Sequence, residues 1–261
     1  MLAAANVRSV LSAAAPEVVL VPGFMQGPAS WSPVIERIHR RYRALALDHR
    51  AHDREGRLAE IERAATPGAA LVGYSLGGRL ALHAALRAAG RPGRFAALVT
   101  LGTSAGLEYE VERERRRAAD RELADWIERA PIEVVVERWE RTPALGGQPP
   151  ELVTAQRADR LSHAPGDLAR LLRSAGQGAM APVWDRIPRL ELPLLALAGE
   201  RDQRYVAAAE RIAALAPRAR ALSIPGAGHA AHLEQPDAFA RALHEFLDDH
   251  LGERGRADRD A

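Results

Sequence analysis

Residues 73–77 are Gly73-Tyr74-Ser75-Leu76-Gly77, and no other part of the chain indicates the fold class as directly. They read G-x-S-x-G between a short apolar run, residues 69–72, and a helical pattern that starts at residue 76. A serine on a tight strand-to-helix turn projects its hydroxyl above the sheet, and small glycines let the turn close. The following helix offers N–H groups to a developing oxyanion. We therefore predict that Ser75 is catalytic; the alternative is an ordinary helix-capping serine.

Short apolar runs bounded by turn residues alternate with helical patterns along the chain. This alternation is typical of a mostly parallel sheet with right-handed crossovers and helices on both faces. The predicted strands cover residues 18–21, 44–47, 69–72, 96–101, 194–198 and 219–224. The predicted helices between and after them cover residues 31–40, 54–65, 76–89, 206–215 and 236–247.

The alternation stops between Leu101 and Leu194. There, charged helical patterns cover residues 108–129, 132–141, 150–161 and 166–174. We predict an α/β core, residues 1–103 and 187–250, interrupted by a helical cap insertion, residues 104–186. The charged tail, residues 251–261, has no apolar face and is expected to be disordered.

Composition excludes several classes of protein. The chain has 261 residues, of which 47% are hydrophobic, so it can bury one sizeable core. Every basic residue other than histidine is arginine, and the absence of lysine excludes a pyridoxal-phosphate Schiff base and a Walker A loop. The absence of cysteine excludes disulfides and thiolate chemistry. A formal net charge of +2 does not argue for a nucleic-acid partner.

The N-terminal stretch from Met1 to Pro16 is alanine-rich and makes a poor signal peptide, because a strand-like run follows at once. No window approaches eighteen uninterrupted apolar residues, so we expect no membrane span. We expect a cytoplasmic monomer or small homo-oligomer that uses no cofactor and no metal.

A serine nucleophile needs a base, and the base needs an acid to hold its tautomer. In folds of this kind the order along the chain is serine, acid, histidine. Asp202 and His229 each follow the carboxyl end of a predicted strand, which is where open α/β sheets place their sites. Glu200 is the alternative acid. His232 is the alternative base, although a loop histidine bonded to backbone is the preferred interpretation of it.

The oxyanion hole is predicted to combine the N–H of Leu76 with that of Phe24, in the loop after the first strand, since Pro22 has no N–H to give. Residues 48–53, Asp-His-Arg-Ala-His-Asp, hold four potential metal ligands, but a hydrogen-bonded loop is preferred over a metal site. Residues 112–117 are interpreted as a charged helix surface with pairs such as Glu112–Arg116.

Several stretches together resemble the MenH family of α/β-hydrolase-fold enzymes, from Val21 to about Phe246. The resemblance is carried by residues 73–82 (GYSLGGRLAL), 197–202 (LAGERD), 226–236 (GAGHAAHLEQP) and, in the insertion, 106–108, 113–120, 138–139 and 181–185. The serine motif alone is generic to the fold. Arg79 after the double glycine, joined to the arginines of the insertion and to the Gly-His-x-x-His ending at residues 228–232, is more specific. The family's usual His-Gly and Asp-Leu-Pro-Gly-His-Gly loops are replaced here by Pro22-Gly23 and by residues 48–53.

The resemblance implies a lyase of menaquinone biosynthesis that expels pyruvate from an enolpyruvyl ether. Its substrate is a small polycarboxylate, for which arginines are suited as planar, permanently charged donors. By position in the family pattern, the substrate-binding residues are Tyr74, Arg79, Arg116, Trp139 and Arg160. Inside the insertion the register is loose, so arginines 113, 115, 117 or 157 are alternatives.

Two other functions remain open from the sequence. A carboxylesterase or C–C-bond hydrolase would use the same serine, histidine and aspartate to form an acyl-enzyme. A non-catalytic binder of acidic metabolites would keep its affinity for carboxylates without Ser75.

Overall fold

The computed structural model describes residues 7–8, 15–48, 50, 52–143, 145 and 147–251. Within them, seven strands form one sheet in the order β1-β3-β2-β4-β5-β6-β7. β1 pairs antiparallel with β3, and every other neighbouring pair is parallel. The strands are β1 (Val7–Arg8), β2 (Glu17–Val21), β3 (Arg43–Ala46), β4 (Ala69–Tyr74), β5 (Phe95–Leu101), β6 (Leu194–Gly199) and β7 (Ala219–Ile224). The predicted mostly parallel α/β fold is confirmed.

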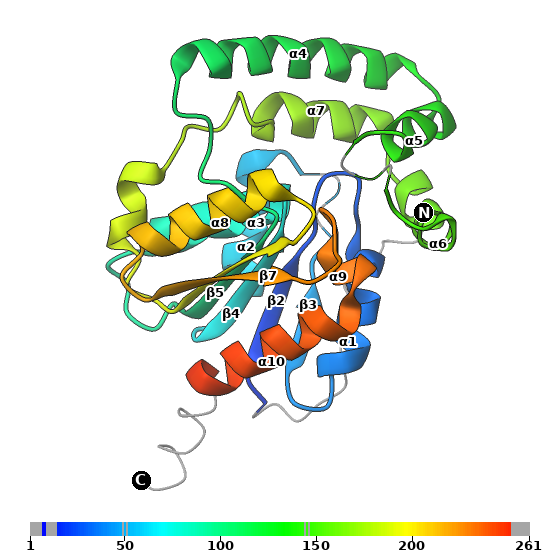
Figure 1. The fold of residues 1–261 in the computed structure, drawn as a ribbon. Helices are drawn as coiled ribbons and strands as arrows, with labels where there is room; N and C mark the ends of the chain where they lie inside the picture. Colours follow the sequence, from blue (N-terminus) through cyan, green and yellow to red (C-terminus); the bar gives the residue numbers. More distant parts are fainter. Residues whose placement is uncertain are drawn as a thin grey trace, which may run out of the picture.

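Helices cover both faces of this sheet (Figure 1). They are η1 (Pro28–Trp31), α1 (Ser32–Ile38), α2 (Arg54–Ala64), α3 (Leu76–Arg87), α8 (Gln203–Leu215), α9 (Ala231–Glu234) and α10 (Pro236–Leu251). The sequence did not predict β1 or the single turn α9. Leu251, predicted as the first residue of the tail, belongs to α10. The rest of that tail, residues 252–261, and most of the predicted N-terminal stretch lie outside the described residues.

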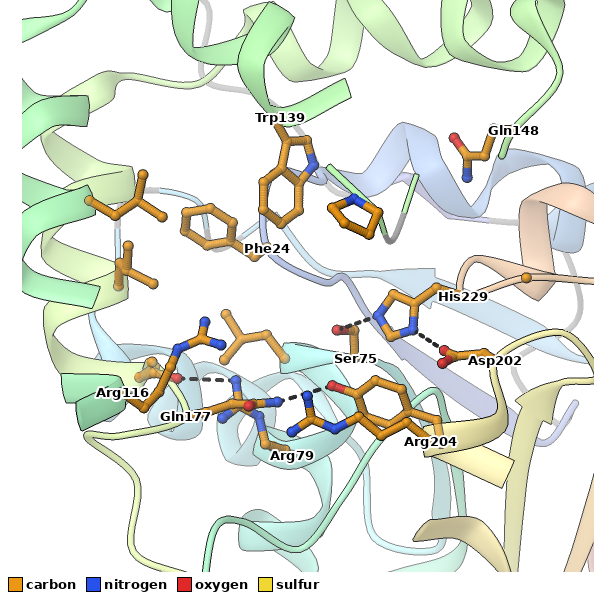
Figure 2. Close-up of a pocket in the computed structure, with 18 of the residues that line it drawn as sticks. Phe24, Ser75, Arg79, Arg116, Trp139, Gln148, Gln177, Asp202, Arg204 and His229 are labelled. Atoms are coloured by element: carbon orange, nitrogen blue, oxygen red, sulfur yellow. Dashed lines mark hydrogen bonds and ion pairs between the residues drawn. The ribbon is translucent and has the colours of Figure 1, made fainter. Parts of the chain in front are cut away.

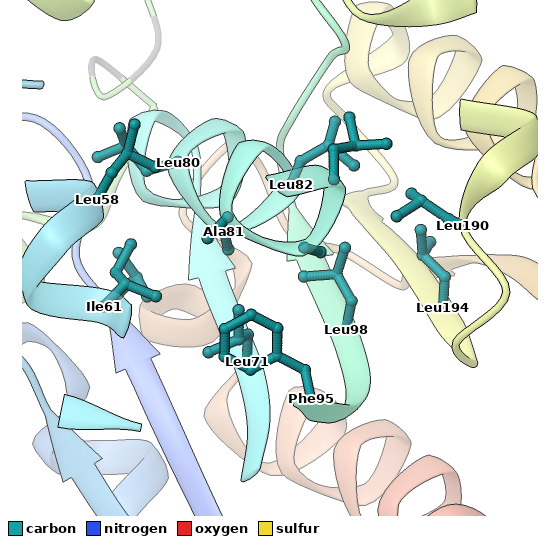
Figure 3. Packing of buried hydrophobic residues seen from close by; sticks show 14 of the residues in the cluster. Leu58, Ile61, Leu71, Leu80, Ala81, Leu82, Phe95, Leu98, Leu190 and Leu194 are labelled. Carbon is teal, nitrogen blue, oxygen red and sulfur yellow. The ribbon is translucent and has the colours of Figure 1, made fainter. Parts of the chain in front are cut away.

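Two apolar layers hold the sheet between the helices. Figure 3 shows one of them, where Leu80 and Leu82 of α3 pack over Leu71 and Leu98 of the central strands. Strands β2, β4, β5 and β6 are buried along their whole length, which is why they read as continuous apolar runs in the sequence. At roughly 1.5–3 kcal/mol for each large buried apolar side chain, these layers fix the carboxyl ends of the strands, where the candidate residues lie.

The segment between β5 and β6 carries α4 (Glu110–Arg129), α5 (Ile132–Glu140), α6 (Pro150–Leu161), α7 (Pro165–Ala175) and η2 (Trp184–Arg189). Figure 1 shows α4 and α7 stacked above the core, with α5 and α6 beside them. We call this segment the insertion; its domain bounds, residues 104–186, stay a prediction. A third apolar cluster joins α4, α5 and α7, and the side chain of Met25, from the loop after β2, enters that cluster. The loop after β2 is therefore anchored in the insertion.

Candidate active site

The turn between β4 and α3 has the geometry that its sequence predicts. Ser75 has φ +52°, in the left-handed region that non-glycine residues rarely adopt. Its N–H donates to Leu101 O at 2.8 Å, which ties the turn to the neighbouring strand. A Cβ on Gly77 would lie 2.2 Å from Val21 O, and one on Gly73 would lie 2.5 Å from Gly77 O. Both glycines are thus required for α3 to start this close to the sheet.

Ser75, His229 and Asp202 lie in hydrogen-bond contact at the carboxyl end of the sheet (Figure 2). His229 Nε2 is 3.1 Å from Ser75 Oγ, and His229 Nδ1 is 2.6 Å from Asp202 Oδ2. The alternative acid, Glu200, does not reach the histidine; its carboxylate accepts from the N–H of Gly226 at 2.7 Å. This is the arrangement by which a histidine, held in one tautomer by a carboxylate, accepts a proton from a serine.

The loop that carries His229 is held from below by Glu234. Its carboxylate accepts from the N–H of Gly228 at 2.6 Å and from that of Ala230 at 3.2 Å. A Cβ on Gly102, which has φ +57°, would lie 3.0 Å from His229 Cε1, so the backbone of the loop after β5 packs directly against the imidazole.

A cavity of about 590 Å³ opens above Ser75, between the core and the insertion. That volume is in the range of small-molecule sites. Its walls are apolar on one side and cationic or polar on the other. The core contributes Phe24, Ser75, Leu76, Arg79, Arg201, Asp202, Arg204, Tyr205, Gly228, His229 and Glu234, and the insertion contributes Arg116, Leu123, Trp139, Pro143, Gly147, Gln148, Leu171, Leu172, Ala175, Gly176 and Gln177.

The floor of the cavity carries more positive than negative charge. Arg79, one helical turn after Ser75, is 8% exposed and donates to Ala175 O at 3.3 Å. Its Nη1 is buried without a hydrogen-bond partner among the described residues. Burial lowers the pKa of Arg79 to about 10. Nearby, Arg116 Nε donates to the buried Asp120 at 2.7 Å, and this ion pair leaves Arg79 without a carboxylate partner among the described residues. The predicted Glu112–Arg116 pair is wrong, since Arg116 pairs with Asp120.

The loop after β2 brings Phe24 to the cavity wall. Met25, the next residue, has φ +59° and is 1% exposed. The Phe24 ring meets the Trp139 indole edge-on, with centroids 5.3 Å apart, and both line the cavity. Leu76 lines the cavity as the first residue of α3, where N–H groups have no partner within the helix. Phe24 and Leu76, the two residues predicted to form the oxyanion hole, therefore both line the cavity that contains Ser75.

Three residues singled out from the sequence lie away from the cavity lining. Tyr74 is 4% exposed and packs beneath His229, with ring centroids 5.2 Å apart. Arg160 is buried in an ion pair with Glu140 at 3.0 Å, on the α5–α6 side of the insertion. His232 is fully buried in α9, and neither of its ring nitrogens has a hydrogen-bond partner among the described residues. The expectation of a loop histidine bonded to backbone was wrong for His232, which packs against Tyr74.

The loop after β3 is closed by its own side chains. Asp48 accepts from both Arg50 Nε, at 2.8 Å, and Arg50 Nη2, at 2.9 Å. Asp53 caps α2 by accepting from Gly56 N. His49 lies outside the described residues. Among those that the structure describes, no three His, Cys, Asp or Glu side chains are grouped to hold a metal.

Comparison with known proteins gives the family. The model of the "Alpha/beta hydrolase family" matches residues 18–242. The chain belongs to the alpha/beta hydrolase family. A relative named 2-succinyl-6-hydroxy-2,4-cyclohexadiene-1-carboxylate synthase, from Salmonella paratyphi C (strain RKS4594), is 32% identical over 249 residues, covering 89% of this chain and 94% of that protein. A Bacillus subtilis (strain 168) protein, named as a candidate for the same synthase, is 36% identical over 180 residues, covering 68% of this chain and 65% of its own length.

Solved structures agree with this assignment of the chain to the alpha/beta hydrolases. The structure of MenH from S. aureus superposes with a TM-score of 0.83 at 28% identity, covering 90% of this chain and 94% of that one. An esterase from Thermogutta terrifontis has a TM-score of 0.77 at 22% identity, covering 94% and 99%, and shows the fold alone. This alpha/beta hydrolase is therefore MenH-like. In the part of the chain that the structure describes, no helix is long and apolar enough to cross a membrane.

Sequence reasoning missed several residues that line or shape the cavity of this alpha/beta hydrolase. Gln148 and Gln177 come from loops of the insertion, and Arg204 and Tyr205 are the second and third residues of α8, which begins directly after Asp202. The position of the last two, just past the candidate acid, could have marked them. No pattern in the sequence marks the two glutamines, because their approach to the core is fixed by how the loops of the insertion pack.

Proposed function

We propose that this protein is a carbon–oxygen lyase of menaquinone biosynthesis. It eliminates pyruvate from 2-succinyl-5-enolpyruvyl-6-hydroxy-3-cyclohexene-1-carboxylate and yields 2-succinyl-6-hydroxy-2,4-cyclohexadiene-1-carboxylate. The names of the curated relatives support this reaction. The observation that carries it in the structure is the Arg79 guanidinium, buried beside Ser75 with Nη1 unpartnered among the described residues.

A buried guanidinium without a carboxylate of its own is costly unless a ligand supplies the anion. Arg79 opens onto the cavity, as do Arg116 and Arg204. Across the described chain, neither Arg79 nor Arg204 forms an ion pair with a carboxylate, and Asp120 pairs with Arg116 alone. The cavity floor therefore suits a ligand that carries more than one carboxylate, as the proposed substrate does.

In the proposed mechanism His229 is the base that activates Ser75, and Asp202 holds the imidazole tautomer. Ser75 Oγ takes a proton from a ring carbon of the substrate while its own proton passes to His229 Nε2. The electron pair of the broken C2–H bond forms a C2=C3 double bond, the pair of the former C3=C4 double bond moves to C4=C5, and the C5–O bond to the enolpyruvyl group breaks. Pyruvate leaves as its enolate, which then takes up a proton. No electrons are gained or lost overall, so the proposal includes no cofactor.

The other predicted residues take supporting roles in this proposal. The N–H groups of Phe24 and Leu76 face negative charge that develops on an oxygen during the reaction. Arg79 and Arg116 bind carboxylates, and Trp139 forms a wall over the ring. Tyr74 acts by packing under His229, whereas Arg160 supports α5 through Glu140. We propose a cytoplasmic monomer or small homo-oligomer that acts on a small polycarboxylate and needs neither nucleic acid nor membrane.

The test is pyruvate release from the enolpyruvyl substrate, followed with a coupled dehydrogenase. Ser75→Ala should abolish release. Arg79→Met should reduce kcat/KM by about 100-fold, since one charge-assisted contact contributes about 1.5–3 kcal/mol. Arg141→Met, at an exposed arginine of the insertion paired with Glu137, is the matched control. Turnover of Arg79→Met at the wild-type rate would contradict the anionic-substrate proposal.

A serine esterase is the second candidate, because the 3.1 Å Ser75–His229 contact equally suits nucleophilic attack. It predicts burst release from a p-nitrophenyl ester and an acyl group trapped on Ser75. The lyase proposal predicts steady pyruvate release with no covalent mass added to the protein.

A further inference from the structure

Tyr205 links the candidate base to the insertion. It is the third residue of α8, the helix that begins directly after Asp202. Its ring packs against the His229 imidazole, with centroids 4.8 Å apart and planes at 40°. Tyr74 packs against the same imidazole at 5.2 Å. Two tyrosine rings thus restrict the histidine whose two nitrogens contact Ser75 and Asp202.

The hydroxyl of Tyr205 is held from the other side of the cavity. Gln177 Nε2 donates to Tyr205 Oη at 3.0 Å. Figure 2 shows Gln177 on the same side of the cavity as Arg79. Gln177 lies in the insertion, directly after Gly176, which ends α7, and both partners line the cavity. Among the described residues that line the cavity, this is the only hydrogen bond that joins a side chain of the insertion to a side chain of the core.

Resting on the proposed function, we infer that Tyr205 is a positioning residue for His229 and that Gln177 sets its position according to where the insertion lies. The ring limits rotation of the imidazole out of line with Ser75 and Asp202. The hydroxyl, bound to Gln177, fixes the ring. When the insertion packs down on the core, the bond forms and the base is held for proton transfer. An insertion that lifts from the core breaks the bond and loosens the base.

The inference gives the ring of Tyr205 and its hydroxyl different roles, and two substitutions of Tyr205 test these roles separately. Tyr205→Leu removes the ring and should lower kcat about 10-fold or more, as expected when a reacting group is misplaced, with KM changed less than about 2-fold. Tyr205→Phe keeps the ring and should recover most of that loss. Tyr205→Phe and Gln177→Leu should each lower kcat about 3-fold, the value of one neutral hydrogen bond. The double variant should lose about 3-fold as well, because a single bond is removed in all three.

A second measurement needs no substrate and so distinguishes a failure of this inference from a failure of the lyase proposal. The short contact between His229 Nδ1 and Asp202 predicts a downfield proton resonance in the ligand-free protein, to be assigned by its loss in Asp202→Asn. We expect Tyr205→Leu to broaden this resonance through faster exchange and Tyr205→Phe to keep it. Tyr74→Leu serves as the comparison for a ring that lies outside the cavity lining.

Three results would overturn the inference. The first is an unchanged resonance and kcat in Tyr205→Leu. The second is losses in Tyr205→Phe and Gln177→Leu that multiply in the double variant, which would show that the two groups act separately. The third is a loss confined to KM, which would make Tyr205 a substrate contact and not a positioning residue.

Discussion

Replacing Arg79 with methionine should make the protein more stable and less active. The guanidinium is 8% exposed, and burial lowers its pKa to about 10 from an ordinary 12.5. A difference of that size corresponds to about 3 kcal/mol by which folding disfavours the charged form. At pH 7 the arginine is charged in both the folded and the unfolded state, so the whole cost is present. The hydrogen bond to Ala175 O returns about 1 kcal/mol, and methionine retains most of the apolar contact.

Arg79→Met is therefore expected to raise the free energy of unfolding by about 1–2 kcal/mol, measured by urea titration at pH 7. Arg141→Met, whose side chain is 75% exposed and paired with Glu137, should change it by less than about 1 kcal/mol. A di- or tricarboxylate ligand should stabilise the wild type and not Arg79→Met. If Arg79→Met instead loses more than about 1 kcal/mol of stability, the charge is compensated within the free protein, and Arg79 is a structural residue.

Three further substitutions test the packing around the site. His232→Leu should leave the free energy of unfolding unchanged or raised at pH 7. Because burial lowers the pKa of His232 to about 3, the wild-type protein has its full stability above about pH 6.5 and loses it toward pH 3, by about 2 kcal/mol at pH 5. Equal losses in the wild type and the variant between pH 7 and 5 would contradict this. Met25→Ala should cost about 2–4 kcal/mol by urea titration, with Met25→Leu close to wild type, because Met25 is 1% exposed within the cluster of the insertion. Gly77→Ala should prevent folding or lower the free energy of unfolding by more than about 3 kcal/mol, measured by thermal or urea unfolding. The control Gly166→Ala, in open space on α7, should raise that free energy by about 0.5–1 kcal/mol. A small loss of stability in Gly77→Ala would refute the tight-turn argument.

The fold could be predicted because its central strands are apolar along their whole length. The run from Leu194 to Ala198 and the run from Ala96 to Leu101 are each bounded by turn residues, and both are strands. Strand β1 was missed because a two-residue pairing leaves no periodicity to detect. Helix α9 was missed because its single turn is too short for a helical pattern.

The candidate triad could be predicted because each member stands at a place that the topology defines. Ser75 follows β4, Asp202 follows β6 and His229 follows β7, and parallel strands bring their carboxyl ends to one edge. The turn after β6 places Asp202, and not Glu200, next to His229. The Glu200 carboxylate accepts from the N–H of Gly226 instead.

The insertion was harder to predict, because helix periodicity indicates which face of a helix is apolar but not which residues of the neighbouring elements that face contacts. Arg116 pairs with Asp120 and opens onto the cavity, while Arg160, on the same kind of charged helix, turns to Glu140. The approach of Gln177 to Tyr205 depends on how α7 ends. The burial of His232 depends on how α9 packs against Trp31, with ring centroids 4.6 Å apart.

The burial of Arg79 gives a physical reason for arginine in place of lysine at this position. Burial there brings the pKa of the guanidinium to about 10, and the side chain stays charged at neutral pH. The same depression applied to a lysine amine, with an ordinary pKa near 10.4, would bring that pKa to about 8. A lysine amine would then be partly neutral under working conditions and would offer no planar pair of donors to a carboxylate. Only an arginine keeps both its positive charge and its planar pair of donors when it is buried this close to Ser75 without a carboxylate partner. The cost of burying it is offset when an anionic ligand enters the cavity.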